Sequence, residues 1–289
     1  MRSMEGPFVA RRCVRSGTGY RWFEQAHAPG DYLDAAQLQR LSGSLPAGDV
    51  PAAPAELVRP DLATWPVLPT PMLLCDPLFG APPDADAGAW EGACTALGAF
   101  LGRLHAVPAA EVSFLPGRRR AAWLPAASAV THRVAAARTD LIRRSDGVLA
   151  LAASAAGPPA RPDCLVHGRF SSGLVVPLDR PVVMGWREAG VGDPDRDLAY
   201  FLAELIEAAA VGTGAARFPA LVRCFLAGYR TVAGQPCLDR LPALVADRLL
   251  EHYAQGVVAV GSADHVEQVA AAATGRWREL ADLLPKGDR

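Results

Sequence analysis

Hydrophobic residues in the second half of the chain recur every three or four positions, which is the spacing of an amphipathic helix. Residues 84–105 show this pattern clearly, with aspartates near the start and Pro108 just beyond the end. After Asp193 the same spacing continues almost to the C-terminus. The pattern there predicts four further helices, over residues 195–211, 217–233, 238–259 and 263–284.

Shorter apolar runs predict strands. In the first third of the chain we expect a strand at 8–10, a short helix over 31–41 that ends before Gly43, and a buried strand at 72–75. Three more short runs, separated by turns, predict strands at residues 164–166, 173–176 and 181–184.

The order of these elements predicts an α+β protein with two lobes. A small strand-bearing N-terminal lobe is expected over residues 1–77, and a mostly helical C-terminal lobe over residues 78–289. No apolar run approaches the roughly 20 residues that span a bilayer, the N-terminus lacks the apolar core of a signal peptide, and the cysteines are scattered singly. We therefore expect a cytoplasmic protein with reduced thiols.

Composition narrows the chemistry further. The net charge of −1 gives no general attraction to nucleic acid or to an anionic membrane, so neither is an expected partner. The sequence contains no asparagine, and Lys286 is its one lysine. These two facts exclude chemistry that needs an Asn side chain, a mid-chain catalytic lysine, or the lysine of a Gly-x-x-x-x-Gly-Lys phosphate loop.

Residues 164–203, CLVHGRFSSGLVVPLDRPVVMGWREAGVGDPDRDLAYFLA, resemble the catalytic segment of the aminoglycoside phosphotransferase and choline kinase-like family. The family pattern there is roughly LVHGDLHPGNVLV followed by IDWExAGxGDPxxDLA. Residues 97–105 resemble the Leu-x-x-Leu-His helix upstream of it. The resemblance implies a protein kinase-like fold with a reduced N-terminal lobe, and ATP- and Mg²⁺-dependent phosphoryl transfer as the family chemistry.

The residues that would perform that chemistry are replaced in this chain. Arg169 stands where the family has the catalytic Asp, Leu174 where it has the metal-binding Asn, and Gly185 where it has the metal-binding Asp. By its motif the chain therefore resembles a degenerate member of the family, and we predict no metal ligands. Several motif positions do match the family: His167, Gly168, Trp186, Asp193 and Asp197.

The N-terminal lobe also departs from the family pattern. Phe8 to Arg11 resembles the strand that carries a phosphate-contacting base, but only seven residues precede it, too few for the strand–loop–strand that covers the nucleotide phosphates. The Gly17-Thr18-Gly19 run comes after that strand. Asp34 is the nearest candidate for an acid that would pair with Arg11.

Arg169 has two interpretations. It either forms a structural ion pair with an acid such as Asp193 or Asp197, or it supplies the charge of a metal-free anion site. We interpret His167 and His105 as structural. Ser171 and Ser172 have no evident base, so a nucleophilic serine is disfavoured. The candidate ligand-binding residues are Arg11, His167, Arg169, Trp186, Arg187 and Glu188, and the motif positions read as structural are His105, Gly168, Asp193 and Asp197.

Two functional hypotheses remain from these observations. The first is a pseudokinase without a cofactor, which binds a protein or peptide partner of a biosynthetic enzyme, or a small anionic ligand, in a bacterial biosynthetic setting. The alternative is an ATP- and Mg²⁺-dependent phosphotransferase acting on a small hydroxylated or amine-bearing molecule. It would need other acids, such as Glu188, Asp193 or Asp195, to bind the metal. A cleft repurposed for other chemistry has no positive support.

Overall fold

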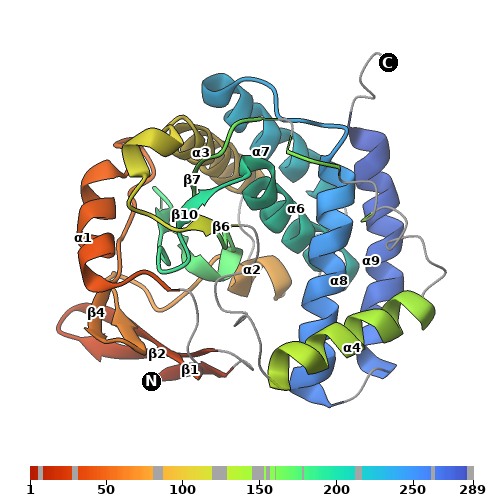
Figure 1. Ribbon diagram of the computed structural model, residues 1–289, viewed down its shortest axis with the longest axis horizontal. Coiled ribbons are helices and arrows are strands. Elements are labelled where there is room, and N and C mark those ends of the chain that lie inside the picture. Colours follow the sequence, from red (N-terminus) through yellow and green to blue (C-terminus); the bar gives the residue numbers. More distant parts are fainter. Residues whose placement is uncertain are drawn as a thin grey trace.

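The N-terminal part of the protein is an antiparallel sheet with one helix beside it (Figure 1). This computed structural model describes residues 1–5, 9–27, 32–80, 87–118, 129–144, 153, 157–159, 161–177, 179–211, 217–261 and 264–284. The five strands lie in the order β1-β2-β3-β5-β4. Their bounds are β1 Arg2–Glu5, β2 Val9–Ser16, β3 Gly19–Ala26, β4 Glu56–Arg59 and β5 Leu62–Thr64, and the helix is α1, Ala35–Ser44.

Strands β2 and β3 form a hairpin whose two-residue turn contains Gly17. Alternate residues of a strand point to opposite faces, so the register decides which side chains face the rest of the protein. Arg11 lies opposite Glu24, and Cys13 lies opposite Trp22; all four side chains are buried. The hairpin thereby places one charged pair among the buried residues of the sheet.

Two expectations for this part were wrong. Leu73 to Cys75 does not form a strand: α2, Cys75–Phe79, begins there instead. The Asp76 carboxylate accepts the N–H of Leu73 at 2.8 Å and pairs with Arg2, which stabilises a turn and helix start. The apolar run is nevertheless buried, because Leu73 and Leu74 pack into the core.

The helix predicted over residues 31–41 begins later in the chain, at Ala35. Asp34 is the N-cap of α1, and it forms a capping box with Gln37. Gly43 lies inside the helix and does not end it. Strands β4 and β5 come from a Pro-rich stretch in which we predicted no strand.

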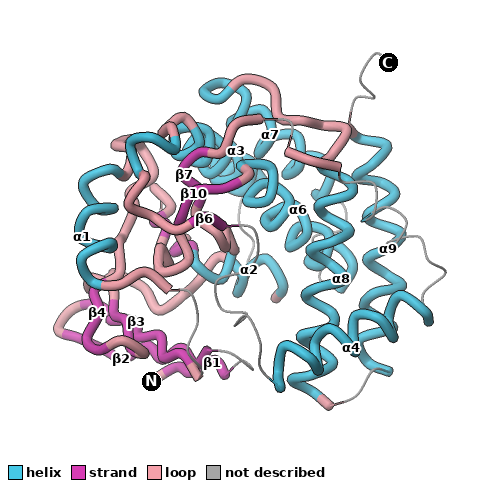
Figure 2. The backbone as a smooth tube through the Cα atoms, in the orientation of Figure 1, coloured by secondary structure: helices cyan, strands magenta, loops and turns pink. Residues whose placement is uncertain are grey.

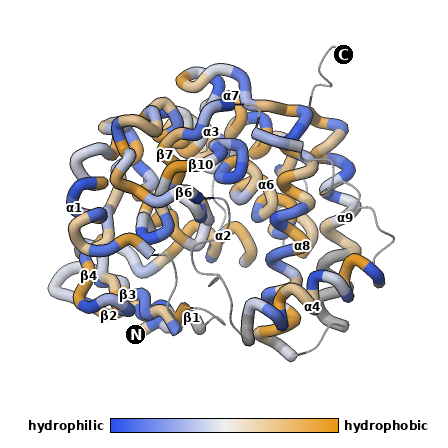
Figure 3. The backbone as a smooth tube through the Cα atoms, viewed as in Figure 1, coloured by the Kyte–Doolittle hydropathy of each residue, from blue (hydrophilic) through white to orange (hydrophobic). Residues whose placement is uncertain are grey.

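The C-terminal part is mostly helical, as predicted (Figure 2). Its long helices are α3 Ala87–His105, α4 Ala129–Arg144, α6 Pro194–Val211, α7 Phe218–Ala233, α8 Leu241–Val260 and α9 Asp264–Leu283. The backbones of α3 and α7 approach so closely that a Cβ on Gly98 would lie 2.0 Å from the Phe225 carbonyl oxygen. Figure 3 shows α6 as a largely hydrophobic helix among the others, and most of its residues are buried. Residues 31, 84–86 and 263 of the predicted helices, and residue 8 of the strand predicted at 8–10, lie outside the described part.

Short strands connect the two parts. Three of them correspond to the predicted runs: β7 Cys164–Val166, β8 Val175–Val176 and β9 Val182–Val183. Two were not predicted, β6 Gly117–Arg118 and β10 Gly190–Gly192, and β10 lies between β6 and β7 in a three-stranded sheet. The described residues also contain two short 3₁₀ turns, η1 Ala109–Val112 and η2 Ser172–Leu174.

The segment between β9 and β10 lies against the N-terminal part. Ala53 N–H donates to the Val183 carbonyl at 2.7 Å, and Leu33 N–H donates to the Arg187 carbonyl at 2.8 Å. The two-lobed α+β prediction is therefore confirmed, whereas the boundary at residue 77 stays a prediction. None of the helices in the described residues is both long and apolar enough to cross a membrane.

Candidate functional site

The loop after β7 is held in place by one carboxylate. Asp197, in the first turn of α6, accepts the backbone N–H of His167 at 2.6 Å and that of Gly168 at 3.0 Å. The Nε2 of His105 lies 3.3 Å from the same carboxylate, and its Nδ1 lies 3.0 Å from the Tyr229 hydroxyl. Because these groups are buried and bonded to one another, Asp197 fixes the path of the loop.

His167 orients the same loop from the other side. Its Nε2 donates to the Met184 carbonyl at 2.8 Å, so Nδ1 is free to accept the backbone N–H of Arg169, 3.3 Å away. Burial lowers the pKa of His167 below its ordinary value, so the ring is neutral. A neutral imidazole with both nitrogens bonded to backbone groups holds the loop and does not face an open site.

The three substituted motif positions gather around this histidine. A Cβ on Gly185 would lie 2.8 Å from the His167 ring and 3.1 Å from the Leu174 side chain, and the Gly185 φ is +106°. Leu174 and Gly185 offer no side-chain oxygen to a metal ion. Arg169, two residues after His167, completes the group at the same end of the cleft.

Arg169 forms an ion pair with an acid that we did not predict. Its Nη1 donates to Glu188 at 2.5 Å, and its Nη2 lies 3.5 Å from Glu24. The expected partners Asp193 and Asp197 bond elsewhere, which corrects that expectation. Burial raises the pKa of Glu188 well above its ordinary value. The nearby charge of Glu24 also raises it, and neighbouring arginines, including Arg11, oppose the shift.

Glu24 is the second acid that the sequence did not reveal. It accepts from the Nε of Arg11 at 2.8 Å, so the expected partner Asp34 is wrong: that residue caps α1. Glu24 also lies 3.7 Å from the Nη1 of Arg187. The strand register would have identified Glu24, because it lies directly across from Arg11 in the β2–β3 hairpin.

Arg187 and Trp186 are almost completely buried beside these residues. The guanidinium of Arg187 donates to the Pro60 carbonyl at 3.0 Å and lies over the Tyr32 ring, 4.3 Å from its centroid. Trp186 has a φ of 71°, a left-handed conformation that costs free energy for any residue but glycine. The turn at 185–188 is thus held in an unusual shape that directs Arg187 and Glu188 inward.

The cleft between these side chains is nearly filled. The cavity lined by Glu24, His167, Arg169, Leu174, Gly185, Trp186, Arg187 and Glu188 measures about 10 Å³. That is about the volume one water molecule needs. Little free space therefore remains between these eight side chains.

The acids proposed as substitute metal ligands are held by arginines. Asp193 pairs with Arg240 at 2.9 Å, and Asp195 pairs with Arg161 at 2.6 Å and with Arg240 at 3.1 Å. Glu188 pairs with Arg169 as described above. No group of three or more His, Cys, Asp or Glu side chains suited to a metal occurs among the described residues. The residues of the cleft therefore do not fit Mg²⁺.

The two serines of the loop are also bonded to an acid. Ser171 donates its hydroxyl to Glu204 at 2.7 Å, and the backbone N–H of Ser172 donates to the same carboxylate at 2.5 Å. Burial raises the pKa of Glu204. The pair ties the loop to the middle of α6, and it lies in the interior of the protein.

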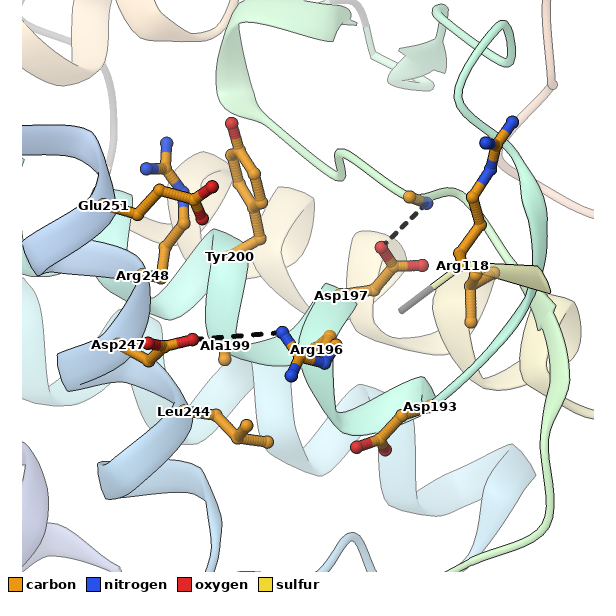
Figure 4. A pocket seen from close by; sticks show the side chains of 12 residues that line it. Arg118, Asp193, Arg196, Asp197, Ala199, Tyr200, Leu244, Asp247, Arg248 and Glu251 are labelled. Carbon is orange, nitrogen blue, oxygen red and sulfur yellow. Dashed lines mark hydrogen bonds and ion pairs between the residues drawn. The ribbon is translucent and has the colours of Figure 1, made fainter. Parts of the chain in front are cut away.

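A second cavity lies on the other side of the loop, between α6 and α8 (Figure 4). It measures about 70 Å³ and is lined by side chains of both charges. Figure 4 shows Asp197 and Tyr200 reaching it from α6, Asp193 from the residue just before α6, and Asp247, Arg248 and Glu251 from α8. Arg118 and Arg196 add two more cations to its lining.

Comparison with known proteins identifies the family of the chain. Residues 6–234 match the sequence model of the Phosphotransferase enzyme family, which is most of the chain. The chain belongs to this family. No curated protein sequence matches it.

Solved structures of this family share the fold at low sequence identity. Macrolide 2'-phosphotransferase MphH from Brachybacterium faecium is 21% identical, with a TM-score of 0.50 over 100% of this chain and 92% of that one. Spectinomycin phosphotransferase APH(9)-Ia is 14% identical, with a TM-score of 0.55 over 98% and 91%. Amicoumacin kinase hAmiN is 13% identical, with a TM-score of 0.58 over 98% and 89%. These likenesses show the fold, and the chemistry of this family member depends on its own residues.

Proposed function

We propose that this member of the phosphotransferase family works by binding and does not transfer phosphate. The observation that carries the proposal is the ion pair between Arg169 and Glu188. Arg169 stands at the position where the family motif places a carboxylate that accepts or orients the proton of the substrate hydroxyl. A guanidinium stays protonated at any usable pH, so it cannot accept that proton.

The absence of oxygen ligands at the two metal positions supports the same proposal. The side chains at Leu174 and Gly185 cannot coordinate a hard cation such as Mg²⁺, and the Glu188 carboxylate is already paired with Arg169. Phosphoryl transfer depends mainly on positioning and on neutralising the charge of the phosphates, which Mg²⁺ normally supplies. Losing the proton acceptor and both ligands together removes the main contributions to the rate.

The cavity between α6 and α8 suggests what the protein binds. It lies outside the filled cleft and has three arginines and four acids in its lining. Several of these acids are already paired, but the buried Nε and Nη1 of Arg248 have no hydrogen-bond partner within the described residues, so an anionic group of a small molecule or of a peptide would find donors there. This supports a protein or peptide partner, as the sequence suggested, with the pathway of that partner still a prediction.

The alternative, a phosphotransferase with substitute ligands, has the family match in its favour, but the acids it needs are already paired with arginines. Asp193 and Asp195 would have to leave Arg240 and Arg161 to reach a metal ion. Breaking a buried ion pair costs about 3–5 kcal/mol, which metal binding would have to offset.

The test is an assay for transfer of the γ-phosphate. The purified protein is incubated with radiolabelled ATP or GTP, Mg²⁺ or Mn²⁺, and a set of amine- and hydroxyl-bearing acceptors. We expect no labelled product and no phosphate release above a protein-free blank. Transfer that is present in the wild type and lost in Asp193→Asn or Asp195→Asn would overturn the proposal and favour the alternative.

A further inference from the structure

The filled cleft contains more positive than negative charge. Three guanidiniums surround the carboxylate of Glu24: Arg11 at 2.8 Å, Arg169 at 3.5 Å and Arg187 at 3.7 Å. Glu188 is the second carboxylate of this group, and Arg118 also acts on its charge. These three guanidiniums and two carboxylates are all buried and together carry a net charge of +1, to which the nearby Arg118 adds further positive charge. We call Arg11, Arg169 and Arg187 the arginine cage.

Several donors of the cage make no hydrogen bond. Arg187 is 1% exposed, and its Nε and Nη1 have no hydrogen-bond partner within the described residues. The same is true of the Nη2 of Arg11. Buried donors without a partner are costly, so native proteins keep them where a ligand or water completes the site. Here the cavity of about 10 Å³ adjoins Arg187 and Arg169.

Glu24 lies at the centre of the cage and comes from the same N-terminal sheet as Arg11. It lies on β3 of the N-terminal sheet, whereas Arg169 and Arg187 come from the loops after β7 and β9. Its carboxylate therefore occupies the position that an external anion would take between these guanidiniums. Without Glu24, the cage and Glu188 would carry a net charge of +2, which a dianion balances.

We propose that the arginine cage is a metal-independent site for one phosphate-class oxyanion, and that Glu24 occupies it as an internal ligand. Guanidiniums bind phosphate oxygens through paired N–H groups, which suits this ligand over a halide. The side chains of Arg11 and Arg169 each keep 10% of their surface exposed, so both lie close to the surface of the protein. The inference rests on the proposed function, because it places arginines where Mg²⁺ would otherwise hold the phosphates.

The experiment compares phosphate binding by the wild type and by Glu24→Ala. Inorganic phosphate is titrated in EDTA at constant ionic strength, with calorimetry and the melting temperature as readouts. We expect Glu24→Ala to bind phosphate at least about tenfold more tightly than the wild type, and its melting temperature to rise saturably with phosphate. Adding Arg169→Met to Glu24→Ala should abolish the gain.

Two further variants keep the test decisive. Glu24→Gln removes the charge at nearly constant volume and replaces the alanine variant if that one does not fold. Glu207→Ala is the matched control, because this buried glutamate pairs with His252 outside the cage, and it should gain no phosphate affinity. The site is overturned if the folded Glu24 variants bind phosphate no better than the wild type, or if the Arg169→Met change leaves their binding intact.

The source of the oxyanion and the proposed function are tested in separate arms. Pyrophosphate and ATP are titrated in the same EDTA buffer, and tighter binding of ATP would assign the site to the phosphates of a nucleotide. Repeating these titrations with Mg²⁺ in place of EDTA should leave the affinities of the Glu24 variants for each ligand unchanged. Binding by the wild type that requires Mg²⁺ would contradict the proposed function, while a lack of binding by the Glu24 variants in EDTA contradicts only the cage.

Discussion

Replacing Gly168 by alanine should leave little folded protein. The residue has a φ of +82°, and an added Cβ would lie 2.0 Å from the carbonyl oxygen of Glu188. A left-handed conformation costs about 1–2 kcal/mol for alanine, and relieving the contact requires the backbone at Glu188 to move. That turn holds Glu188 beside Arg169, so moving it also disrupts their ion pair. We therefore expect the free energy of unfolding to fall by more than about 4 kcal/mol in total.

Urea unfolding followed by circular dichroism measures this effect. Gly43→Ala is the matched control, because Gly43 lies within α1 and has no atom within 4 Å of an added Cβ. That change should stabilise the protein slightly, by about 0.5–1 kcal/mol. Similar unfolding midpoints for the two variants would mean that the loop path through Gly168 is wrong.

Arg169→Met should destabilise the protein by about 3–5 kcal/mol at neutral pH. The change leaves Glu24 and Glu188 close together in the interior with less positive charge to offset them. Arg143→Met is the control: the side chain is 71% exposed and its pair with Asp140 lies on the surface, so the loss should stay below about 1 kcal/mol.

The loss of stability caused by Arg169→Met should depend on pH. Burial and the charge of Glu24 already raise the pKa of Glu188 in the folded state. Removing the positive charge of its ion-pair partner Arg169 should raise that pKa further. A carboxyl group whose pKa is higher in the folded than in the unfolded state makes the folded protein less stable as the pH rises from the unfolded pKa to the folded pKa. The penalty should therefore be small near pH 4, grow towards neutral pH, and shrink when Glu188→Gln is added. A penalty that is constant from pH 4 to 8 would show that Glu188 is not the partner that Arg169 neutralises.

Much of the fold could be predicted because its signals are local. The helices α3 and α6 to α9 follow from a hydrophobic spacing that holds over four or more turns, and the strands from 164 to 183 follow from short runs between turns. Leu73 to Cys75 was assigned wrongly, because a three- or four-residue apolar run fits a buried strand and a buried helix start equally well. The Asp76 carboxylate distinguishes them, because it accepts the Leu73 N–H and pairs with Arg2, 74 residues away.

The sequence predicted where the residues of the candidate site lie in the chain, but not the side chains with which they pair. The motif located Arg169, Leu174 and Gly185, and the structure brings all three to one end of the cleft. The partners of Arg169 could not be predicted from spacing, since Glu24 is 145 residues away on the other lobe. Its choice of Glu188 over Asp197 depends on the turn at Gly185 and Trp186, whose positive φ values are set by packing. Asp197 is unavailable because three groups of the loop and α3 already surround it.

The central claim is that buried ion pairs occupy the cleft where a family member would bind Mg²⁺ and a nucleotide. The most direct test is a calorimetric titration of the wild-type protein with ATP, once with Mg²⁺ and once with EDTA. The account predicts no Mg²⁺-dependent binding, with the two titrations superimposable up to millimolar ATP. Micromolar binding that appears only with Mg²⁺ would contradict it.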